Sequence, residues 1–205
     1  LEILEEAYRD IGQKFGHFPS KPIIVVLHTK DSFQGATGSP AWADGLYDPS
    51  LGRIQIPTQG ATTDSKYLAS VLRHEYVHAL LHDRLGTNVG ALPTWLNEGL
   101  AMQWAGDDTW PELDQATQGK ISVIPLASLE GSWGTLPSGT STVAYFEANS
   151  ATRYMIERWG LARVDELLSA FQAKSSVATA FQNVLLISYE EFQHQWIESF
   201  EQHRS

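Results

Sequence analysis

The order of the predicted elements favours an α+β fold. Strand-like segments rich in Ile and Val occur only in the first third of the 205-residue chain, and amphipathic helices fill most of the rest. An alternating strand–helix order would indicate a parallel sheet instead. The length fits one domain of residues 1–205, with the sheet and a long helix in residues 1–90 and a mostly helical lobe in residues 91–205.

The first sixty residues are predicted to combine one helix with three strands. Apolar residues recur at helical spacing from Leu1 to Ile11, and Gly16 ends that pattern. A run of Ile and Val predicts a buried strand, and Asp48–Gly52 has the chemistry of a hairpin turn. The expected elements are a helix over 1–15, a buried strand over 22–28, a loop over 35–40 and a hairpin of residues 45–47 and 53–56.

The rest of the chain is predicted to be helical, apart from a turn-rich stretch at 106–139. Asp64 or Ser65 caps a long helix, and Ser188 with Glu191 forms a capping box for the last one. Gly160 suits the stop of an intermediate helix. The expected helices cover about 65–83, 94–105, 141–159, 163–173, 175–186 and 189–202.

Composition excludes several classes of function. The formal net charge is −10 and Lys and Arg do not cluster, so we expect neither a nucleic-acid partner nor a basic membrane-surface helix. The longest apolar run, Ile23–Leu27, is too short to span a bilayer. Because the chain has no Cys, any metal ion must be held by His, Asp or Glu.

His74, Glu75 and His78 form the pattern His-Glu-x-x-His within the long predicted helix. Residues four apart share one helix face, so two imidazoles can reach one ion at about 2.0–2.1 Å. Glu75 is rotated by about 100° from His74, which suits contact with a water on that ion. Two imidazoles with a carboxylate favour Zn²⁺. The alternative, two solvent-facing or core histidines, fits this largely apolar helix poorly, because an unpartnered buried His is costly.

A third ligand is expected from the segment Thr94–Ala101, which reads TWLNEGLA. Catalytic zinc needs three protein ligands and an open position. Glu98 lies in this short, mostly apolar helical segment, where a carboxylate needs a partner that a metal ion would supply. We therefore predict that Glu98 completes the site.

Together the two motifs resemble those of the gluzincin clan of metallopeptidases. Within that clan the chain looks like a bacterial peptidase-MA-like domain, related to aminopeptidase-N-type catalytic domains. The resemblance implies a zincin, thermolysin-like fold in which His74, His78 and Glu98 hold Zn²⁺. It also implies that Glu75 acts as the general base.

Two further segments are similar to parts of that family. Residues 144–160 resemble the helix after the metal site, which implies that Tyr145 stabilises the oxyanion, with Tyr154 as the second choice. Residues 41–47 resemble the substrate-binding edge strand. A peptide or protein substrate is therefore expected to bind along an edge strand near residues 45–56, either at 45–47 or at 53–56.

Two of the chain's departures from the family pattern bear on its function. Met102 stands where thermolysin-type relatives have an aspartate that orients a zinc ligand. The edge strand lacks the glutamate with which aminopeptidases hold the substrate's α-amine, and Asp44 is the candidate replacement. These departures favour an endopeptidase or a protease with a restricted target over an aminopeptidase.

The predicted function is zinc-dependent hydrolysis of peptide bonds by a water that the metal activates. Two alternatives stay open: a non-catalytic binding module stabilised by zinc, and a zinc hydrolase of a non-peptide amide or ester. We expect a monomer. The chain begins at Leu1 rather than Met, as a mature fragment without its signal peptide would, which favours an extracytoplasmic or secreted location.

Overall fold

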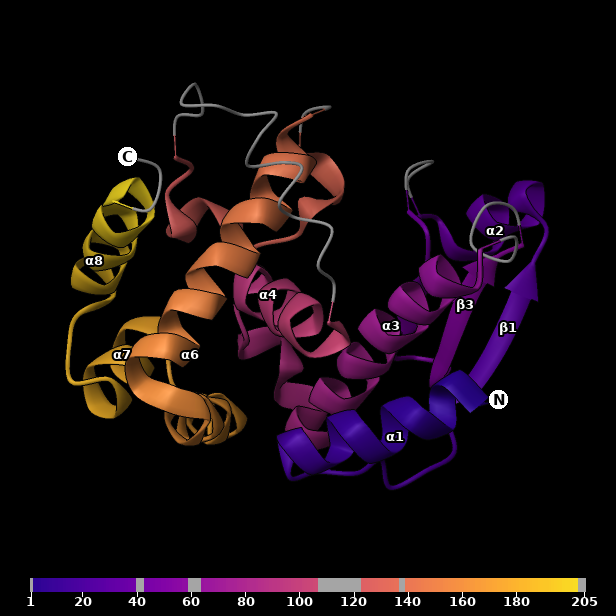
Figure 1. Ribbon diagram of the computed structural model, residues 1–205, viewed down its shortest axis with the longest axis horizontal. Helices are drawn as coiled ribbons and strands as arrows, with labels where there is room; N and C mark the ends of the chain where they lie inside the picture. Colours follow the sequence, from indigo (N-terminus) through magenta and orange to yellow (C-terminus); the bar gives the residue numbers. More distant parts are fainter. Residues whose placement is uncertain (1, 40–42, 59–63, 107–122, 137–138, 203–205) are drawn as a thin grey trace. The chain divides into compact units, whose positions relative to one another are not determined.

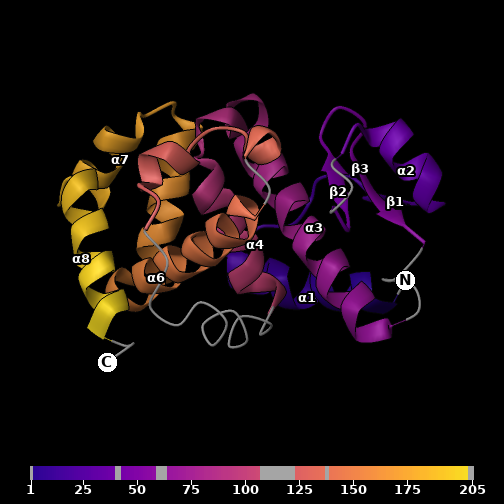
Figure 2. The same cartoon turned by 90° about the horizontal axis from the view of Figure 1, so that it is seen from above.

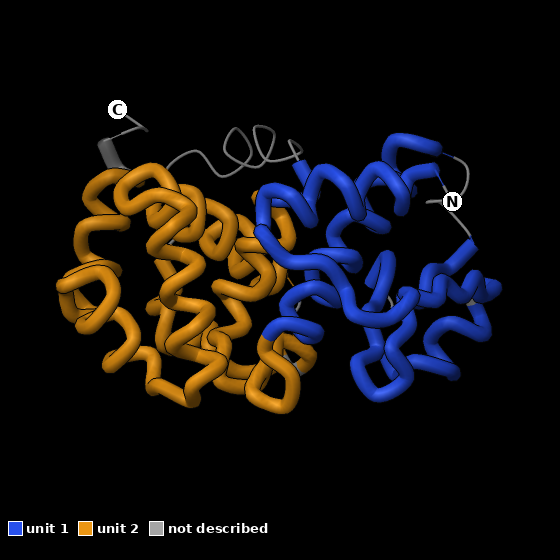
Figure 3. The backbone as a smooth tube through the Cα atoms, turned by 90° about the horizontal axis from the view of Figure 1, so that it is seen from below, with its two compact units in different colours: residues 1–84, 104–106 blue, residues 85–103, 107–205 orange. Residues whose placement is uncertain are grey.

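Figure 1 shows the computed structural model, which describes residues 2–39, 43–58, 64–106, 123–136 and 139–202. The chain forms two compact units (Figure 3). The first contains residues 1–84 and 104–106, and the second contains residues 85–103 and 107–205. Helices combine with one small mixed sheet, which is consistent with the α+β prediction.

The first unit contains a three-stranded sheet in the order β1-β3-β2 (Figure 2). The strands are β1 (Ile24–His28), β2 (Leu46–Asp48) and β3 (Arg53–Pro57). β1 runs parallel to β3, with Ile24 opposite Arg53. β2 runs antiparallel to β3, with Leu46 opposite Gln55, so the predicted hairpin is confirmed.

β1 is less buried than its composition predicts. Ile24 is 51% exposed and Leu27 is 57% exposed, whereas Ile54 and Ile56 of β3 are fully buried. The strand order explains the difference, because β1 lies at an edge of the sheet and β3 lies in its centre. The strand predicted over 22–28 is therefore present, but the prediction that it is buried was wrong. A run of Ile and Val indicates a strand without showing how many neighbours cover it.

An additional helix, α2 (Lys30–Thr37), follows β1 and lies beside β1 and β3 (Figure 2). The Thr29 side chain caps its start by accepting a hydrogen bond from the Ser32 amide at 3.3 Å. Gly38 adopts the left-handed conformation after its last turn, and Phe33 is buried. The predicted loop over 35–40 was therefore wrong for its first three residues.

The long helix α3 (Ser65–Leu85) and the N-terminal helix α1 (Glu2–Phe15) complete the first unit. Asp64 caps α3, because its carboxylate accepts a hydrogen bond from the Lys66 amide at 2.8 Å. Val77 and Leu80 on this helix are fully buried, as the apolar run predicts. α3 matches the predicted helix except that it extends two residues further.

The second unit is helical throughout its described part. Its elements are η1 (Gly86–Ala91), α4 (Thr94–Ala105, whose last two residues belong to the first unit), η2 (Leu126–Leu129), η3 (Trp133–Thr135), α6 (Thr140–Gln172), α7 (Val177–Val184) and α8 (Tyr189–Gln202). The Trp95 indole donates a hydrogen bond to the Tyr189 hydroxyl at 2.8 Å. Phe181 and Phe192 pack around the same indole. This aromatic core joins α4, α7 and α8.

α6 covers two predicted helices, 141–159 and 163–173, which meet at a kink. Gly160 lies at the kink with φ 80° and ψ 165°, which is not a helical conformation. The predicted break at Gly160 is thus confirmed, although the second helix follows without an intervening loop. No helix in the described ranges, α6 included, is both long enough and apolar enough to cross a membrane.

Candidate metal centre

α3 carries His74, Glu75 and His78 on consecutive turns of one regular helix. The Nε2 atoms of the two histidines lie 3.1 Å apart, and both side chains are half-buried. Two ligands at about 2.05 Å from a tetrahedral zinc ion lie about 3.3 Å apart. The histidine pair therefore already has nearly the spacing that one ion requires.

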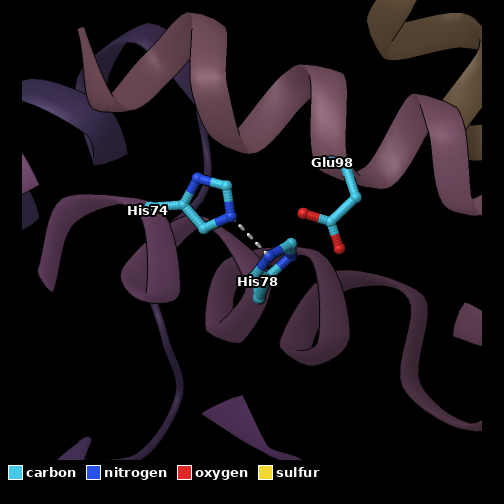
Figure 4. A group of neighbouring side chains, drawn as sticks. All are labelled: His74, His78 and Glu98. Atoms are coloured by element: carbon cyan, nitrogen blue, oxygen red, sulfur yellow. Dashed lines mark hydrogen bonds between the residues drawn. The ribbon is translucent and has the colours of Figure 1, made fainter. Parts of the chain in front are cut away.

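Glu98 lies on α4, in a helical segment that is apolar on all sides. Trp95, Leu96 and Leu100 around it are fully buried, whereas Glu98 itself is half-buried. The ligand atoms of His74, His78 and Glu98 all lie within 4.8 Å of one another. Figure 4 shows the carboxylate and the two imidazole rings directed toward one another.

The donor set fits a metal ion on chemical grounds. Two neutral imidazole nitrogens and one carboxylate oxygen match the ligands that zinc binds in proteins, and three protein ligands leave a position open. Ca²⁺ and Mg²⁺ prefer mostly oxygen donors. The three side chains predicted as ligands are therefore brought together by the structure as a group that could hold a metal ion.

Gly99, the residue after Glu98, allows α4 to lie very close to α6. A Cβ atom at this position would lie 2.8 Å from the Thr152 Cβ, and it would overlap the Thr152 hydroxyl and the Ala148 carbonyl oxygen. Any side chain here would push against the backbone of α6. The Glu-Gly pair in the TWLNEGLA segment thus combines a candidate ligand with the glycine that lets its helix pack.

Glu75 is 7% exposed and is covered by the residues that precede β2. A Cβ atom at Gly45 would lie 3.0 Å from the Glu75 Oε1 and 2.9 Å from the Val71 Cγ1. The backbone at Gly45 therefore packs directly on the Glu75 side chain. Sequence alone did not predict this contact, because the two residues are thirty positions apart.

The strand order restricts where an extended substrate could pair. β3 is hydrogen-bonded to β1 on one side and, at Arg53–Gln55, to β2 on the other, so residues 53–55 do not form an edge. Backbone groups that are paired on both sides are not free to bind a peptide, which favours residues 45–47 over residues 53–56 as the substrate strand. β2 lies at the end of the sheet order in the described part of the chain, and it begins one residue after Gly45.

Tyr145 lies in the second turn of α6 and is half-buried. Its ring packs edge-on against Trp133, with the centroids 4.9 Å apart. Trp133 is itself fixed, because its indole donates a hydrogen bond to the Leu129 carbonyl at 3.1 Å. Tyr154, the second choice for the same role, donates to Gln195 at 3.4 Å and packs against Phe192. The geometry of Tyr154 is that of a packing residue.

Glu147 is a buried acid that the sequence analysis did not identify. It is 2% exposed, and its carboxylate accepts a hydrogen bond from the Ile124 amide at 3.0 Å. Burial raises the pKa of this carboxyl to about 7, and the hydrogen bond opposes the shift. The available signal was an acidic residue between Phe146 and Ala148 in the helix that the prediction used only for Tyr145 and Tyr154.

Comparison with known proteins adds one positive finding. A family model described as the peptidase MA superfamily matches residues 5–202, nearly the whole chain. A search of curated proteins and a search of solved structures each returned no match. The family match confirms the resemblance drawn from residues 74–78 and 94–101, and it indicates a metallopeptidase-like function. The chain therefore belongs to the peptidase MA superfamily.

Proposed function

We propose that this chain is a zinc-dependent peptidase with a zincin-type site, in which an activated water attacks the peptide carbonyl. The observation that carries the proposal is the group of His74, His78 and Glu98, whose ligand atoms lie within 4.8 Å of one another. Membership of the peptidase MA superfamily supports the same reaction class. When bound, zinc lowers the pKa of a water molecule and polarises a substrate carbonyl.

Glu75 is the proposed general base. It follows His74 directly on α3, and its carboxylate is almost fully buried. A general base must accept the proton of the attacking water and then return it to the leaving amine. The packing of Gly45 on this side chain restricts where the carboxylate can lie, which supports a fixed position for the proton transfer.

Tyr145 is the proposed donor to the oxyanion. Its ring is supported by Trp133, which a hydrogen bond to Leu129 holds in place. A donor contributes most when its position is fixed before the reaction, because no reorganisation is then needed as charge develops. Loss of one such donor typically raises the barrier by about 2.7–4 kcal/mol.

The proposed substrate is an extended peptide that pairs with β2. An edge strand binds peptide backbone with little selection of side chains. Residues 43–48 read ADGLYD and contain no glutamate to hold an α-amine. We therefore favour an endopeptidase or a protease with a restricted target. Asp44, which is exposed next to Gly45, is the residue to test for an amine contact.

Glu75→Gln tests the proposal with the metal site intact. The variant should bind zinc with the stoichiometry of the wild type, because Glu75 is not among the three ligands, and it should lose hydrolysis of a quenched fluorescent peptide library. Metal content measured by atomic absorption and hydrolysis measured by fluorescence separate the two effects. Glu98→Ala should lose zinc as well as activity.

Two outcomes would contradict parts of the proposal. Wild-type activity in Glu75→Gln would exclude Glu75 as the base, and unchanged zinc content in Glu98→Ala would remove Glu98 from the ligands. A wild-type protein that binds zinc but cleaves neither peptides nor protein substrates would favour the binding module. Cleavage of simple esters or amides without peptides would favour the broader hydrolase.

A further inference from the structure

In the described part of the chain, β1 has a partner strand on one side only (Figure 2). The Thr58 amide, directly after β3, donates a hydrogen bond to the His28 carbonyl at 2.7 Å, so the backbone groups of His28 point toward β3. Residues two apart along a strand direct their backbone groups to the same side, and the residues between them direct theirs to the other side. The backbone groups of Val25 and Leu27 therefore point to the open edge.

The open edge lacks the features that usually prevent edge strands from pairing. Residues 22–29 contain no Lys, Arg, Asp or Glu, and their single proline, Pro22, precedes the strand. Ile24 and Leu27, at the two ends of the strand, are large apolar side chains that lie exposed. Natural edge strands commonly carry a charge, a proline or a bulge that blocks a further strand. β1 is therefore open to pairing through both its backbone and its side chains.

Exposed apolar side chains continue from the start of β1 onto α1. Tyr8 and Phe18 are both exposed, and their rings pack with the centroids 4.9 Å apart. Tyr8 and Ile23 line the same pocket between α1 and the segment before β1. Contiguous apolar surface of this kind commonly marks a site of protein association.

The charges that flank β1 indicate which chain can cover it. Lys21 precedes the strand and Asp31 follows it, and both are exposed. Each lies five positions from Val26. A second copy that pairs antiparallel about Val26 therefore brings the Lys21 end of each copy to the Asp31 end of the other. Lys30, the neighbour of Asp31, then falls opposite the uncharged Pro22.

We propose that β1 binds a second copy of this chain, by antiparallel pairing of the two β1 strands about a twofold axis near Val26. Such an interface is isologous, because each copy supplies the same residues. Val25 of one copy lies opposite Leu27 of the other and exchanges backbone hydrogen bonds with it. Lys21 and Asp31 form an ion pair at each end. The dimer replaces the monomer expected from the sequence, and it does not depend on the proposed peptidase function.

Sedimentation velocity at increasing concentrations of the chain tests the dimer. We expect reversible association with a Kd of about 10–100 µM, because an interface of one strand pair and its flanks is small. Amide hydrogen exchange measured by NMR locates the interface. The amides of Val25 and Leu27 should become protected as the dimer forms, whereas those of Ile24 and Val26, which point toward β3, should be protected at every concentration.

Variants at the open edge should prevent association. Val25→Pro removes an outward N–H group and should raise the Kd at least about tenfold. Leu27→Lys keeps the backbone and places a charge at the edge, with the same expected effect. Leu161→Lys changes an exposed leucine of α6, in the second unit, and should leave the Kd unchanged. Thermal melting of each variant verifies that it is folded.

A charge exchange tests the identity of the partner. Lys21→Asp or Asp31→Lys alone brings like charges together at both ends of the strand pair and should raise the Kd about threefold to tenfold. The double variant restores opposite charges and should recover the Kd of the wild type. A residue that acted only on the stability of its own copy would not show this recovery.

Three results would overturn the proposal. One is a chain that stays monomeric at about 1 mM, ten times the largest expected Kd. Another is a dimer that Val25→Pro and Leu27→Lys leave unchanged, which would place the contact on a different surface. The last is a double charge variant that associates no better than the single ones, which would remove the pairing that identifies a second copy as the partner. None of these measurements uses zinc or activity, so each is distinguishable from a failure of the proposed function.

Discussion

Two glycines lie beside proposed site residues, and they pack against different kinds of atoms. Gly45 packs on the Glu75 carboxylate and the Val71 side chain, whereas Gly99 packs on the Ala148 carbonyl oxygen and the Thr152 side chain. Side-chain ends can rotate away from an added methyl group, but a backbone oxygen within a helix cannot. The contact at Gly99 therefore maintains the fold, and the contact at Gly45 positions one side chain.

The two glycines therefore have different expected roles, one in stability and one in activity. Both glycines lie next to residues with proposed chemistry, since Gly99 follows the proposed ligand Glu98 and Gly45 packs on the proposed base Glu75. We expect an added methyl group to lower stability at one position and activity at the other.

Gly99→Ala should give the largest effect. The new Cβ would overlap the Ala148 carbonyl and the Thr152 hydroxyl, so α4 must move away from α6. Overpacking of this kind costs about 1–3 kcal/mol and occasionally more, and we expect about 3 kcal/mol because backbone atoms are involved. Urea unfolding followed by circular dichroism measures the loss.

A double variant identifies the rigid part of this contact. Thr152→Ala in the Gly99→Ala background removes the overlapping hydroxyl but leaves the Ala148 carbonyl in place. Only partial recovery of the free energy of unfolding is therefore expected. Full recovery would show that the Thr152 side chain alone restricts Gly99, and the contrast with Gly45 would disappear.

Glu147 adds a pH-dependent effect to the same part of α6. Its pKa is raised from 4.5 to about 7 in the folded protein, mainly by burial. The folded state therefore binds the proton more tightly than the unfolded state, so stability falls as pH rises from 4.5 to 7 and is level above 7. The loss should be about 3 kcal/mol, because the pKa rises by about 2.5 and each pKa unit corresponds to about 1.4 kcal/mol.

Glu147→Gln isolates this titration from those of other groups. Glutamine is uncharged and keeps an oxygen that can accept the Ile124 hydrogen bond. The variant should be more stable than the wild type at pH 8 and similar to it at pH 4.5, by urea unfolding at each pH. A constant difference between the two proteins over this range would mean that Glu147 ionises normally.

Gly45→Ala should have a smaller effect than Gly99→Ala, and it should lower activity rather than stability. The added Cβ lies 3.0 Å from the Glu75 Oε1, so the carboxylate must shift by a few tenths of an ångström. If Glu75 is the base, kcat should fall about tenfold, which corresponds to about 1.4 kcal/mol in the barrier. Zinc content should stay the same, and the free energy of unfolding should change by less than about 1 kcal/mol.

Adding Val71→Ala to Gly45→Ala tests whether the lost rate comes from crowding of Glu75. It removes the Cγ1 atom that lies 2.9 Å from the new Cβ, which gives the strand room to move without displacing Glu75. The double variant should therefore regain part of the lost rate. A Gly45→Ala variant with the full rate of the wild type would show that this contact does not hold the carboxylate.

Sequence was sufficient where the signal is local. The ends of α3 follow from the Asp64 cap and Gly86, and the pairing of His74 with His78 follows from helical spacing. The placement of Glu98 among apolar helical residues was likewise visible in the TWLNEGLA segment. These features depend on residues within one or two turns of one another.

Sequence was insufficient where distant segments decide the outcome. The exposure of β1 depends on the strand order, and the close approach at Gly45 joins residues thirty positions apart. Glu147 is unusual because of its burial, which no local pattern reveals. α2 is different, because the Thr29 cap and Gly38 are local signals that the prediction did not use.

Thr152→Val should have the smallest effect, with the opposite sign to Gly99→Ala. The Thr152 hydroxyl is fully buried and has no hydrogen-bond partner in the described ranges, although a threonine in a helix commonly bonds the carbonyl four residues earlier, here that of Ala148. Replacing an unpaired hydroxyl by a methyl removes its desolvation cost, but the larger methyl presses on Gly99. We therefore expect a net gain in the free energy of unfolding of about 0.5–1 kcal/mol.

Thr152→Ser keeps the hydroxyl and loses a methyl group, so it should be destabilising. A loss of stability in Thr152→Val would contradict the expectation that an unpaired hydroxyl determines the sign of this change.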